Sequence, residues 1–127
     1  MPDRLPLDND FIRKIHHIIS ENITNEQFGV SELSARVGMS RSNLLRKLKK
    51  LSGLSVSQFI RQVRLEKAAE LLQDEEMTVS EIAYRVGFSS PSYFIKCFHD
   101  HYGYPPGEAA KNAGDLQEEP NDEPGKK

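Results

Sequence analysis

Five basic side chains lie in one short stretch of the sequence, and their chemistry suits the binding of a polyanion. The stretch runs from Ser40 to Gly53 and contains no acidic residue. An arginine can grip the O6 and N7 atoms of guanine with two hydrogen bonds, whereas lysines more often contact phosphates and fix the register of a protein on DNA. The pattern predicts a helix that binds duplex DNA. Its basic residues are Arg41, Arg46, Lys47, Lys49 and Lys50.

Helical spacing divides this stretch into a buried face and an exposed face. Leu44, Leu48 and Leu51 recur at positions i, i+4 and i+7, so we expect them to face the core. Leu45 is an apolar residue on the opposite, polar face, where it is suited to contact a thymine methyl group. A basic run can also be no more than the solvated face of an exposed helix. The surrounding sequence decides between this interpretation and DNA binding. The expected base contacts are Arg41, Ser42, Leu45 and Arg46, and the expected phosphate contacts are Lys47, Lys49 and Lys50.

The basic stretch follows a segment that occurs twice. Residues 30–40 (VSELSARVGMS) return as residues 79–89 (VSEIAYRVGFS), and a helical run that stops at a glycine follows each copy. Two copies at a spacing of 49 to 50 residues are too few to bury the core of a solenoid. Each copy instead has the pattern of a helix, a tight turn and a second helix. The tandem pair predicts two DNA-binding helix-turn-helix units.

The turn of each copy has its own signals. Gly38 and Gly87 stand where the chain must adopt a positive φ, and a small side chain four residues earlier lets the two helices pack closely. Serine is a preferred residue at the start of a helix, because its side chain accepts a hydrogen bond from a free backbone N–H group. We expect Ser40 and Ser89 to cap the second helix of their copies.

The second copy offers fewer charges to DNA than the first. Phe94 and Phe98 are core residues by their spacing, and His99 and Asp100 follow them. We therefore expect weaker or less base-specific contacts here. For Tyr93, packing against the turn and contact with a phosphate remain equally open. The candidates are Ser92 and Lys96 for bases, and Ser90 and Tyr93 for phosphates.

A long helix is expected between the two copies. Residues 55–72 form an uninterrupted helical pattern and would make a rod of roughly 27 Å at about 1.5 Å per residue. Such a rod can set two recognition helices about one DNA turn, roughly 34 Å, apart on one duplex face. Arg61 lies on this helix, where a phosphate contact and a salt bridge to a neighbouring helix remain equally open.

The whole pattern predicts an all-α chain of seven helices and two subdomains. Asp8 or Asn9 can cap a first helix that reaches about Ile23, and Pro106 can open a short last helix to about Lys111. The other helices are expected over 30–37, 41–52, 55–72, 79–86 and 91–102. The expected organisation is a flexible lead-in (1–7), a first helix-turn-helix subdomain (8–54), a linker helix (55–73), a second subdomain (74–112) and a disordered acidic tail (113–127).

Composition describes a polar helical protein whose charge is unevenly distributed. The net charge of −2 argues against a nucleic-acid partner, but residues 111–127 contain five acids against three lysines. DNA phosphates respond to the local electrostatic potential rather than to the net charge of the whole protein, so we still expect the basic stretch to bind DNA. The sequence has no 18-residue apolar run and no hydrophobic leader, and Cys97 is its one cysteine. These features favour a cytoplasmic location.

Catalytic and metal-binding interpretations find little support in the residues. On a helix Cys97 and His101 share a face while His99 points about 200° away from Cys97, so the three cannot converge on one metal ion. The sequence has no phosphate-cradling glycine loop and no catalytic triad, so we expect no enzyme activity, metal or cofactor. The alternative function is a helical protein-interaction module whose basic helix binds an acidic partner. It predicts salt-sensitive binding without preference for any duplex sequence.

Several spaced motifs resemble the AraC/XylS family of bacterial transcription regulators. GFSSPSYFIKCF at 87–98, followed by YGYPP at 102–106, is similar to the signature of that family, and residues 60–72 resemble its linker helix. The resemblance covers residues 11–111. It implies seven helices in two homeodomain-like helix-turn-helix units that bind successive major grooves of promoter DNA. The base-contacting positions of the family fall at Ser42, Leu45 and Arg46.

The first half of the chain adds a narrower resemblance. Residues 11–53 are similar to the output domain of hybrid two-component regulators, which ends a long sensor protein. This implies fused sensor or receiver domains and RNA polymerase as partners. The chain is then either trimmed from a longer regulator, which we favour, or a stand-alone short regulator. Two positions depart from the family pattern. Pro105 replaces the serine that usually caps the last helix, and Ala109 replaces an anchoring aromatic residue.

Overall fold

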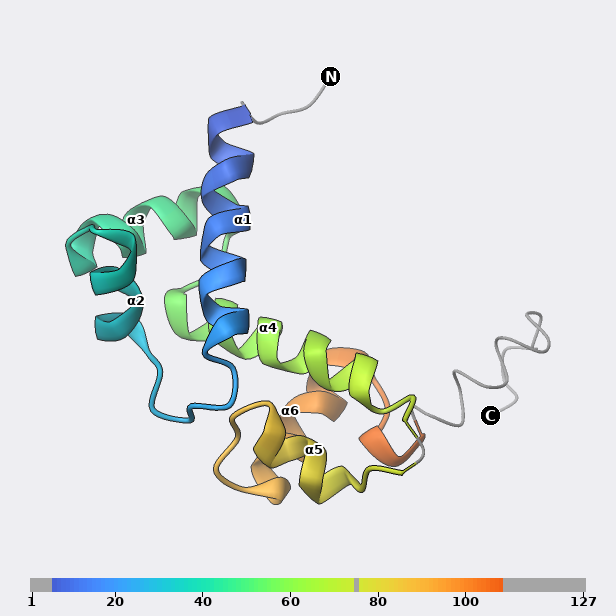
Figure 1. Cartoon of the computed structure of the whole chain (residues 1–127). Coiled ribbons are helices and arrows are strands. Elements are labelled where there is room, and N and C mark those ends of the chain that lie inside the picture. The colour runs from blue at the N-terminus through green and yellow to red at the C-terminus, as the bar shows by residue number, and fades with distance from the viewer. Residues whose placement is uncertain (1–5, 75, 109–127) are drawn as a thin grey trace. The chain divides into compact units, whose positions relative to one another are not determined.

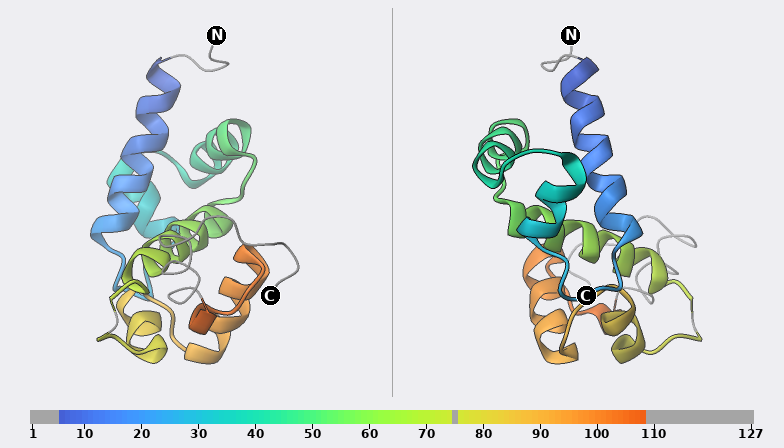
Figure 2. Two further views of the ribbon diagram at one scale, coloured as in Figure 1. Left: turned by 90° about the vertical axis from the view of Figure 1, so that its right-hand side faces the viewer. Right: turned by 60° about the vertical axis from the view of Figure 1, so that its left-hand side comes forward.

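The computed structural model describes residues 6–74 and 76–108, which contain six complete helices and no strand. Figure 1 labels these helices and Figure 2 shows them from two other sides. A further helical turn begins at Pro106 and is described through Glu108. The all-α prediction is confirmed. The helices are α1 (Pro6–Glu21), α2 (Val30–Val37), α3 (Arg41–Ser52), α4 (Val56–Leu71), α5 (Val79–Arg85) and α6 (Pro91–Tyr102).

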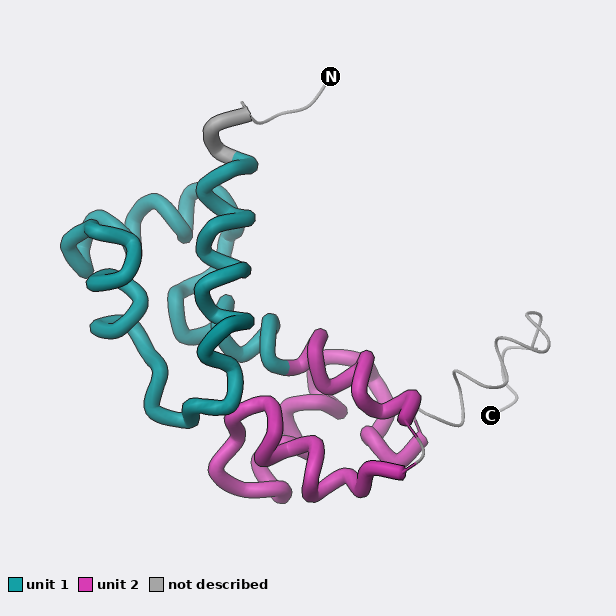
Figure 3. Tube along the Cα trace, in the orientation of Figure 1, with its two compact units in different colours: residues 1–64 teal, residues 65–127 magenta. Residues whose placement is uncertain are grey.

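The chain divides into two compact units, residues 1–64 and residues 65–127 (Figure 3). The division falls within α4, so the first part of this helix belongs to unit 1 and the rest to unit 2. Within the described ranges, no helix is both long and apolar enough to span a bilayer. The expected acidic tail at 113–127 and the position of Ala109 lie outside the described residues.

Unit 1 has a mainly aliphatic core to which all its helices contribute. α1 contacts both α2 and α3, which contact each other. The spacing of the apolar residues explains this arrangement, because positions three and four apart fall on one face of a helix. Burying these side chains stabilises the unit by about 1.5–3 kcal/mol for each large aliphatic or aromatic group. The core residues are Ile15, Ile19, Phe28, Leu33, Leu44, Leu48, Val56, Phe59, Ile60 and Val63.

Unit 2 is built around a row of aromatic rings. The ring centroids of Phe88 and Phe94 lie 5.2 Å apart, and those of Phe94 and Phe98 lie 5.8 Å apart. Tyr102 continues the row at 4.6 Å from Phe98, and burial raises the pKa of its hydroxyl. Pro106 is among the fully buried side chains, so the last described turn is packed although Pro105 supplies no capping oxygen. Tilted ring pairs at these distances add to the stabilisation from burial.

The two helix-turn-helix units turn in the same way. Gly38 has φ 80° and Gly87 has φ 92°, which confirms the positive φ expected at both glycines. The residue after each glycine donates its backbone N–H to the equivalent carbonyl: Met39 to Ser34 at 3.1 Å and Phe88 to Ala83 at 2.9 Å. A residue with a Cβ is strained at such φ values.

From the start of the first helix to the start of the second, the second helix-turn-helix is one residue longer than the first, and this corrects a predicted cap. Ser40 caps α3 as expected, since its Oγ accepts from Asn43 N at 3.1 Å. The cap of α6 is Ser90 rather than Ser89, with Oγ accepting from Tyr93 N at 3.2 Å. Pro91 explains the shift, because proline has no N–H and is favoured at the first helical position, directly after the cap. The repeat offset therefore grows from 49 residues at α2 and α5 to 50 at α3 and α6.

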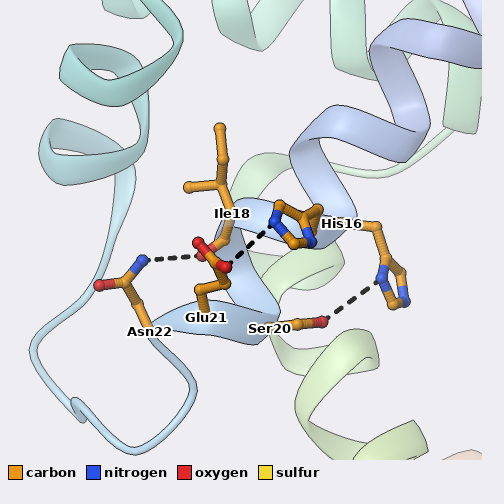
Figure 4. A network of polar contacts seen from close by, with 6 residues as sticks. His16, Ile18, Ser20, Glu21 and Asn22 are labelled. Atoms are coloured by element: carbon orange, nitrogen blue, oxygen red, sulfur yellow. Dashed lines mark hydrogen bonds and ion pairs between the residues drawn. The ribbon is translucent and has the colours of Figure 1, made fainter.

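Three other helices, α1, α4 and α5, have boundaries that differ from the prediction. α1 begins at Pro6, inside the predicted lead-in, because proline is tolerated in a first turn. It ends at Glu21 rather than Ile23, and the Asn22 side chain donates to Ile18 O at 2.8 Å, which satisfies a terminal carbonyl (Figure 4). α5 ends at Arg85, one residue early. α4 begins at Val56, after a reciprocal cap: Oε1 of Gln58 accepts from Ser55 N at 2.9 Å, and Oγ of Ser55 accepts from Gln58 N at 3.1 Å.

Arg64 is buried, whereas the sequence pattern places it on the polar side of α4. Its side chain donates to Ile23 O at 2.6 Å and to Asn25 O at 3.1 Å, both in the segment between α1 and α2. Burial lowers the pKa of the guanidinium, and the charge of nearby Glu26 acts in the opposite direction. These hydrogen bonds compensate the cost of burying a cation. Arg64 therefore ties α4 to the segment that leads into α2.

Candidate nucleic-acid interface

The exposed face of α3 holds the predicted base-contacting residues of unit 1. Leu44 and Leu48 are fully buried, which confirms the inward face, while Leu51 is half-buried. This orientation leaves the other side of the helix in solvent. Arg41, Ser42, Leu45, Arg46 and Lys49 are all exposed. Because residues three and four apart are neighbours on a helix, Ser42, Leu45, Arg46 and Lys49 form one surface.

Arg46 is held by a neutral neighbour. Its Nη2 donates a hydrogen bond to Oδ1 of Asn43, one turn earlier on α3. An amide oxygen orients the guanidinium without cancelling its charge. The arrangement leaves a fully cationic fork on the exposed face, which suits two hydrogen bonds to the edge of a guanine.

Two further lysines of α3, Lys47 and Lys50, lie beside this face. The ammonium group of Lys47 lies 4.5 Å from the centroid of the Phe11 ring, so a cation–π contact joins α3 to α1. Lys49 and Lys50 are exposed in the last turn. A shallow open hollow of about 400 Å³ lies along this flank, lined by Met39, Asn43, Arg46, Lys47, Lys50 and Leu51.

The exposed face of α6 repeats that of α3 with less charge. Phe94 and Phe98 are fully buried, whereas Ser92 and Lys96 are exposed. The Nζ atom of Lys96 lies 3.1 Å from Oδ2 of Asp100, and this hydrogen bond and charge raise the pKa of the lysine. Lys96 thus stays protonated at neutral pH, but its charge is compensated within the helix.

Two other candidates for phosphate contact, Ser90 and Tyr93, also have structural roles in unit 2. The Oγ of Ser90 caps α6, and its O–H remains able to donate to a phosphate. Tyr93 is 47% exposed and its ring centroid lies 5.8 Å from that of Phe88, so it both packs and faces solvent. Arg61 is half-buried on α4.

Ile95 is a surface residue that the sequence reasoning overlooked. It is 40% exposed, next to Lys96 on the outer face of α6. The signal was present in the repeat, because the 50-residue offset between α3 and α6 pairs Ile95 with Leu45.

The histidines and the cysteine of the described residues form no metal site. No group of three or more His, Cys, Asp or Glu side chains lies together in these parts of the chain. Cys97 is half-buried. On α1, His16 Nδ1 lies 3.4 Å from Ser20 Oγ (Figure 4). His17 Nε2 lies 3.1 Å from Glu21 Oε2, so both histidines are engaged with neighbours one turn away.

Two helix-turn-helix units, each with an exposed recognition helix, define a DNA-binding domain of the AraC type. The helix-turn-helix domain family matches residues 33–112, which is more than half of the chain. The chain belongs to this family, and the resemblance seen in its motifs is confirmed.

Known proteins place this domain in regulators of several kinds. The chain is 37% identical over 102 residues to histidine kinase P4 of Formosa agariphila, covering 80% of the chain and 7% of the kinase. It resembles the C-terminal domain of the two-component response regulator yesN from Fusobacterium nucleatum with a TM-score of 0.70 and 35% identity, over 80% of this chain and 98% of that one.

A third similar protein has been solved with DNA. The DNA-binding domain of AdpA, a global transcriptional factor, in complex with a target DNA matches with a TM-score of 0.70 and 30% identity. The match covers 87% of this chain and 97% of that domain. The chain spans only about a third of the length of several curated regulators that it matches, as it does for MtrA of Neisseria gonorrhoeae, where the share is 35%.

Proposed function

We propose that the chain reads two successive major grooves of a promoter, one with α3 and one with α6. The observation that carries this proposal is the repeated exposed face, in which a serine, a branched apolar residue and a cation recur on both helices. A helix of this kind fits the major groove, where each base pair presents a distinct pattern of donors, acceptors and methyl groups. The similar AdpA domain in complex with a target DNA supports the same reading.

The residues divide by chemistry into base and phosphate contacts. In α3 we assign Arg46 to a guanine, with Arg41, Ser42 and Leu45 beside it. In α6 we assign Ser92 and Lys96 to bases. Contacts to phosphates position the protein and make binding salt-dependent. We assign these contacts to Lys47, Lys49, Lys50, Arg61, Ser90 and Tyr93.

We further propose that the chain is the output part of a longer regulator. Its likeness to a response-regulator C-terminal domain and to a short part of a histidine kinase supports a sensor or receiver domain as the natural neighbour. Such a regulator acts on promoters in the cytoplasm, through contacts that recruit or exclude RNA polymerase. This chain then directs the regulator to its binding sites on DNA.

Selection of bound duplexes from a random pool tests the central part of the proposal. We expect the full chain to enrich one sequence and to bind it far more tightly than unrelated duplexes of equal length. Fluorescence anisotropy with each competitor measures this ratio at a fixed salt concentration, because non-specific affinity varies steeply with salt. Equal affinity for all duplexes would instead support a module whose basic helix binds an acidic protein.

A further inference from the structure

Two exposed apolar side chains occupy equivalent places on the recognition helices. Leu45 on α3 is 43% exposed, and Ile95 on α6 is 40% exposed. Their positions differ by 50 residues, the offset that also relates the first residues of α3 and α6. Each comes directly after a fully buried core residue, Leu44 or Phe94, which fixes the direction of the helix face.

The neighbours of these two residues match as well. On α3 the residues at i, i+3 and i+4 are Ser42, Leu45 and Arg46, and on α6 they are Ser92, Ile95 and Lys96. Residues at this spacing share one surface. Each recognition helix therefore displays a hydroxyl group, a branched apolar side chain and a cation in the same order. Single exposed apolar residues are common on proteins, but a repeated trio points to a repeated ligand feature.

We propose that Leu45 and Ile95 each contact the methyl group of a thymine, so that both halves of the DNA site contain a thymine beside the base pair read by the cation. This inference rests on the proposed function. Thymine is the one base with a methyl group in the major groove, and an aliphatic side chain can make no hydrogen bond to a base edge. Removing one methyl-sized group from water is worth about a fourfold gain in affinity.

The other exposed large apolar residues of the described chain supply a control. Tyr93 contacts Phe88 and so takes part in packing, whereas Tyr84 lies on α5 and is 55% exposed. Tyr84 is not on a recognition helix. Its replacement removes an exposed apolar group of similar exposure from a surface to which we assign no DNA contact.

Removal of single methyl groups from the DNA tests the inference. The duplex selected by the full chain is resynthesised with deoxyuridine in place of one thymidine at a time, and each affinity is measured by fluorescence anisotropy. We expect at least one position in each half of the site where the loss of the methyl weakens binding about fourfold. Leu45→Ala should abolish this sensitivity in one half and Ile95→Ala in the other, while Tyr84→Ala leaves both unchanged.

Two results would overturn the inference and leave the proposed function standing. One is tight, selective binding with no position sensitive to deoxyuridine. The other is methyl sensitivity that persists in both alanine variants. Both variants replace an exposed helical residue by a good helix former, so they should fold, and circular dichroism confirms this. If the selection enriches no sequence, the proposed function fails and this inference fails with it.

Discussion

The two helix-turn-helix units share one backbone plan and fill it with different side chains. At equivalent positions of the recognition helices, unit 1 buries Leu44 and Leu48, whereas unit 2 buries Phe94 and Phe98. Both cores are closed under a turn with a glycine of positive φ. The shared backbone arrangement therefore determines which positions of the recognition helix face inward, and either aliphatic or aromatic side chains can fill the core at these positions.

The exposed faces of the two recognition helices differ in charge. Arg46 is oriented by the neutral amide of Asn43, while the equivalent Lys96 lies 3.1 Å from the carboxylate of Asp100. α3 also carries four further cations and no acid. A duplicated fold can thus keep its geometry while its two copies take unequal shares of the binding energy. We infer that unit 1 is the anchor on DNA and unit 2 the weaker partner.

The largest effects are expected from breaking the two cores. Leu44→Ala should lower the free energy of unfolding by about 2–5 kcal/mol and Phe94→Ala by about 3–5 kcal/mol, because each leaves a cavity in a packed unit. Urea denaturation followed by circular dichroism measures both values. The exposed neighbours provide matched controls, since Leu45→Ala and Ile95→Ala should change stability by no more than about 0.5 kcal/mol. A core variant as mild as its control would show that the position is not packed.

The next largest effect is expected on DNA affinity, from replacing the cations at two equivalent positions, Arg46 and Lys96. Arg46→Ala should weaken binding to the selected site by about 1–3 kcal/mol and hardly change binding to random DNA, because a base contact supplies discrimination. Lys96→Ala should cost less, since Asp100 already compensates its charge. Anisotropy titrations of both duplexes give the comparison, with Arg13→Ala on α1 as the control, an exposed arginine paired with Asp10. Equal losses for the two variants would contradict the assigned asymmetry.

The smallest effect should come from releasing Lys96. In Asp100→Asn the pKa of Lys96 falls back towards its ordinary value, and the lysine remains charged at neutral pH without a carboxylate beside it. Binding to the selected site should tighten more than binding to random DNA, because Lys96 is assigned to a base and a base contact supplies discrimination. Glu70→Gln frees Lys67 on α4 in the same way and should leave both affinities unchanged. An affinity for the selected site that Asp100→Asn does not alter would show that Lys96 does not contact a base there.

Periodicity and caps predict most of this fold because they depend on nearby residues. The bounds of α2, α3 and α6 agree with the prediction, since a serine or glycine marks the start and a glycine the end of each. The predicted α6 cap is wrong because Ser89 and Ser90 can both cap a helix, and the choice depends on Pro91, which follows Ser90. Local residue preference alone does not resolve such a pair.

Contacts between distant segments were beyond the sequence patterns. Arg64 reads as a surface residue of an amphipathic helix, and its burial follows from carbonyl groups about 40 residues away in the chain, at Ile23 and Asn25. The i, i+4 spacing of Lys96 and Asp100 predicts an ion pair on the helix, but this spacing alone does not show whether the pair lies on the face that contacts DNA. Ile95 was recoverable from the repeat, once the one-residue growth of the second helix-turn-helix is known.

The most direct test of the account uses one titration on three duplexes: the selected site, the site with the α3 half scrambled and the site with the α6 half scrambled. The half in which Arg46→Ala removes base preference is the α3 half, and the other is the α6 half. If both units read DNA and unit 1 is the anchor, both scrambled duplexes bind more weakly, and loss of the α3 half costs more than about tenfold. Undiminished binding after the α6 half is scrambled, or a greater loss there than in the α3 half, would contradict the account.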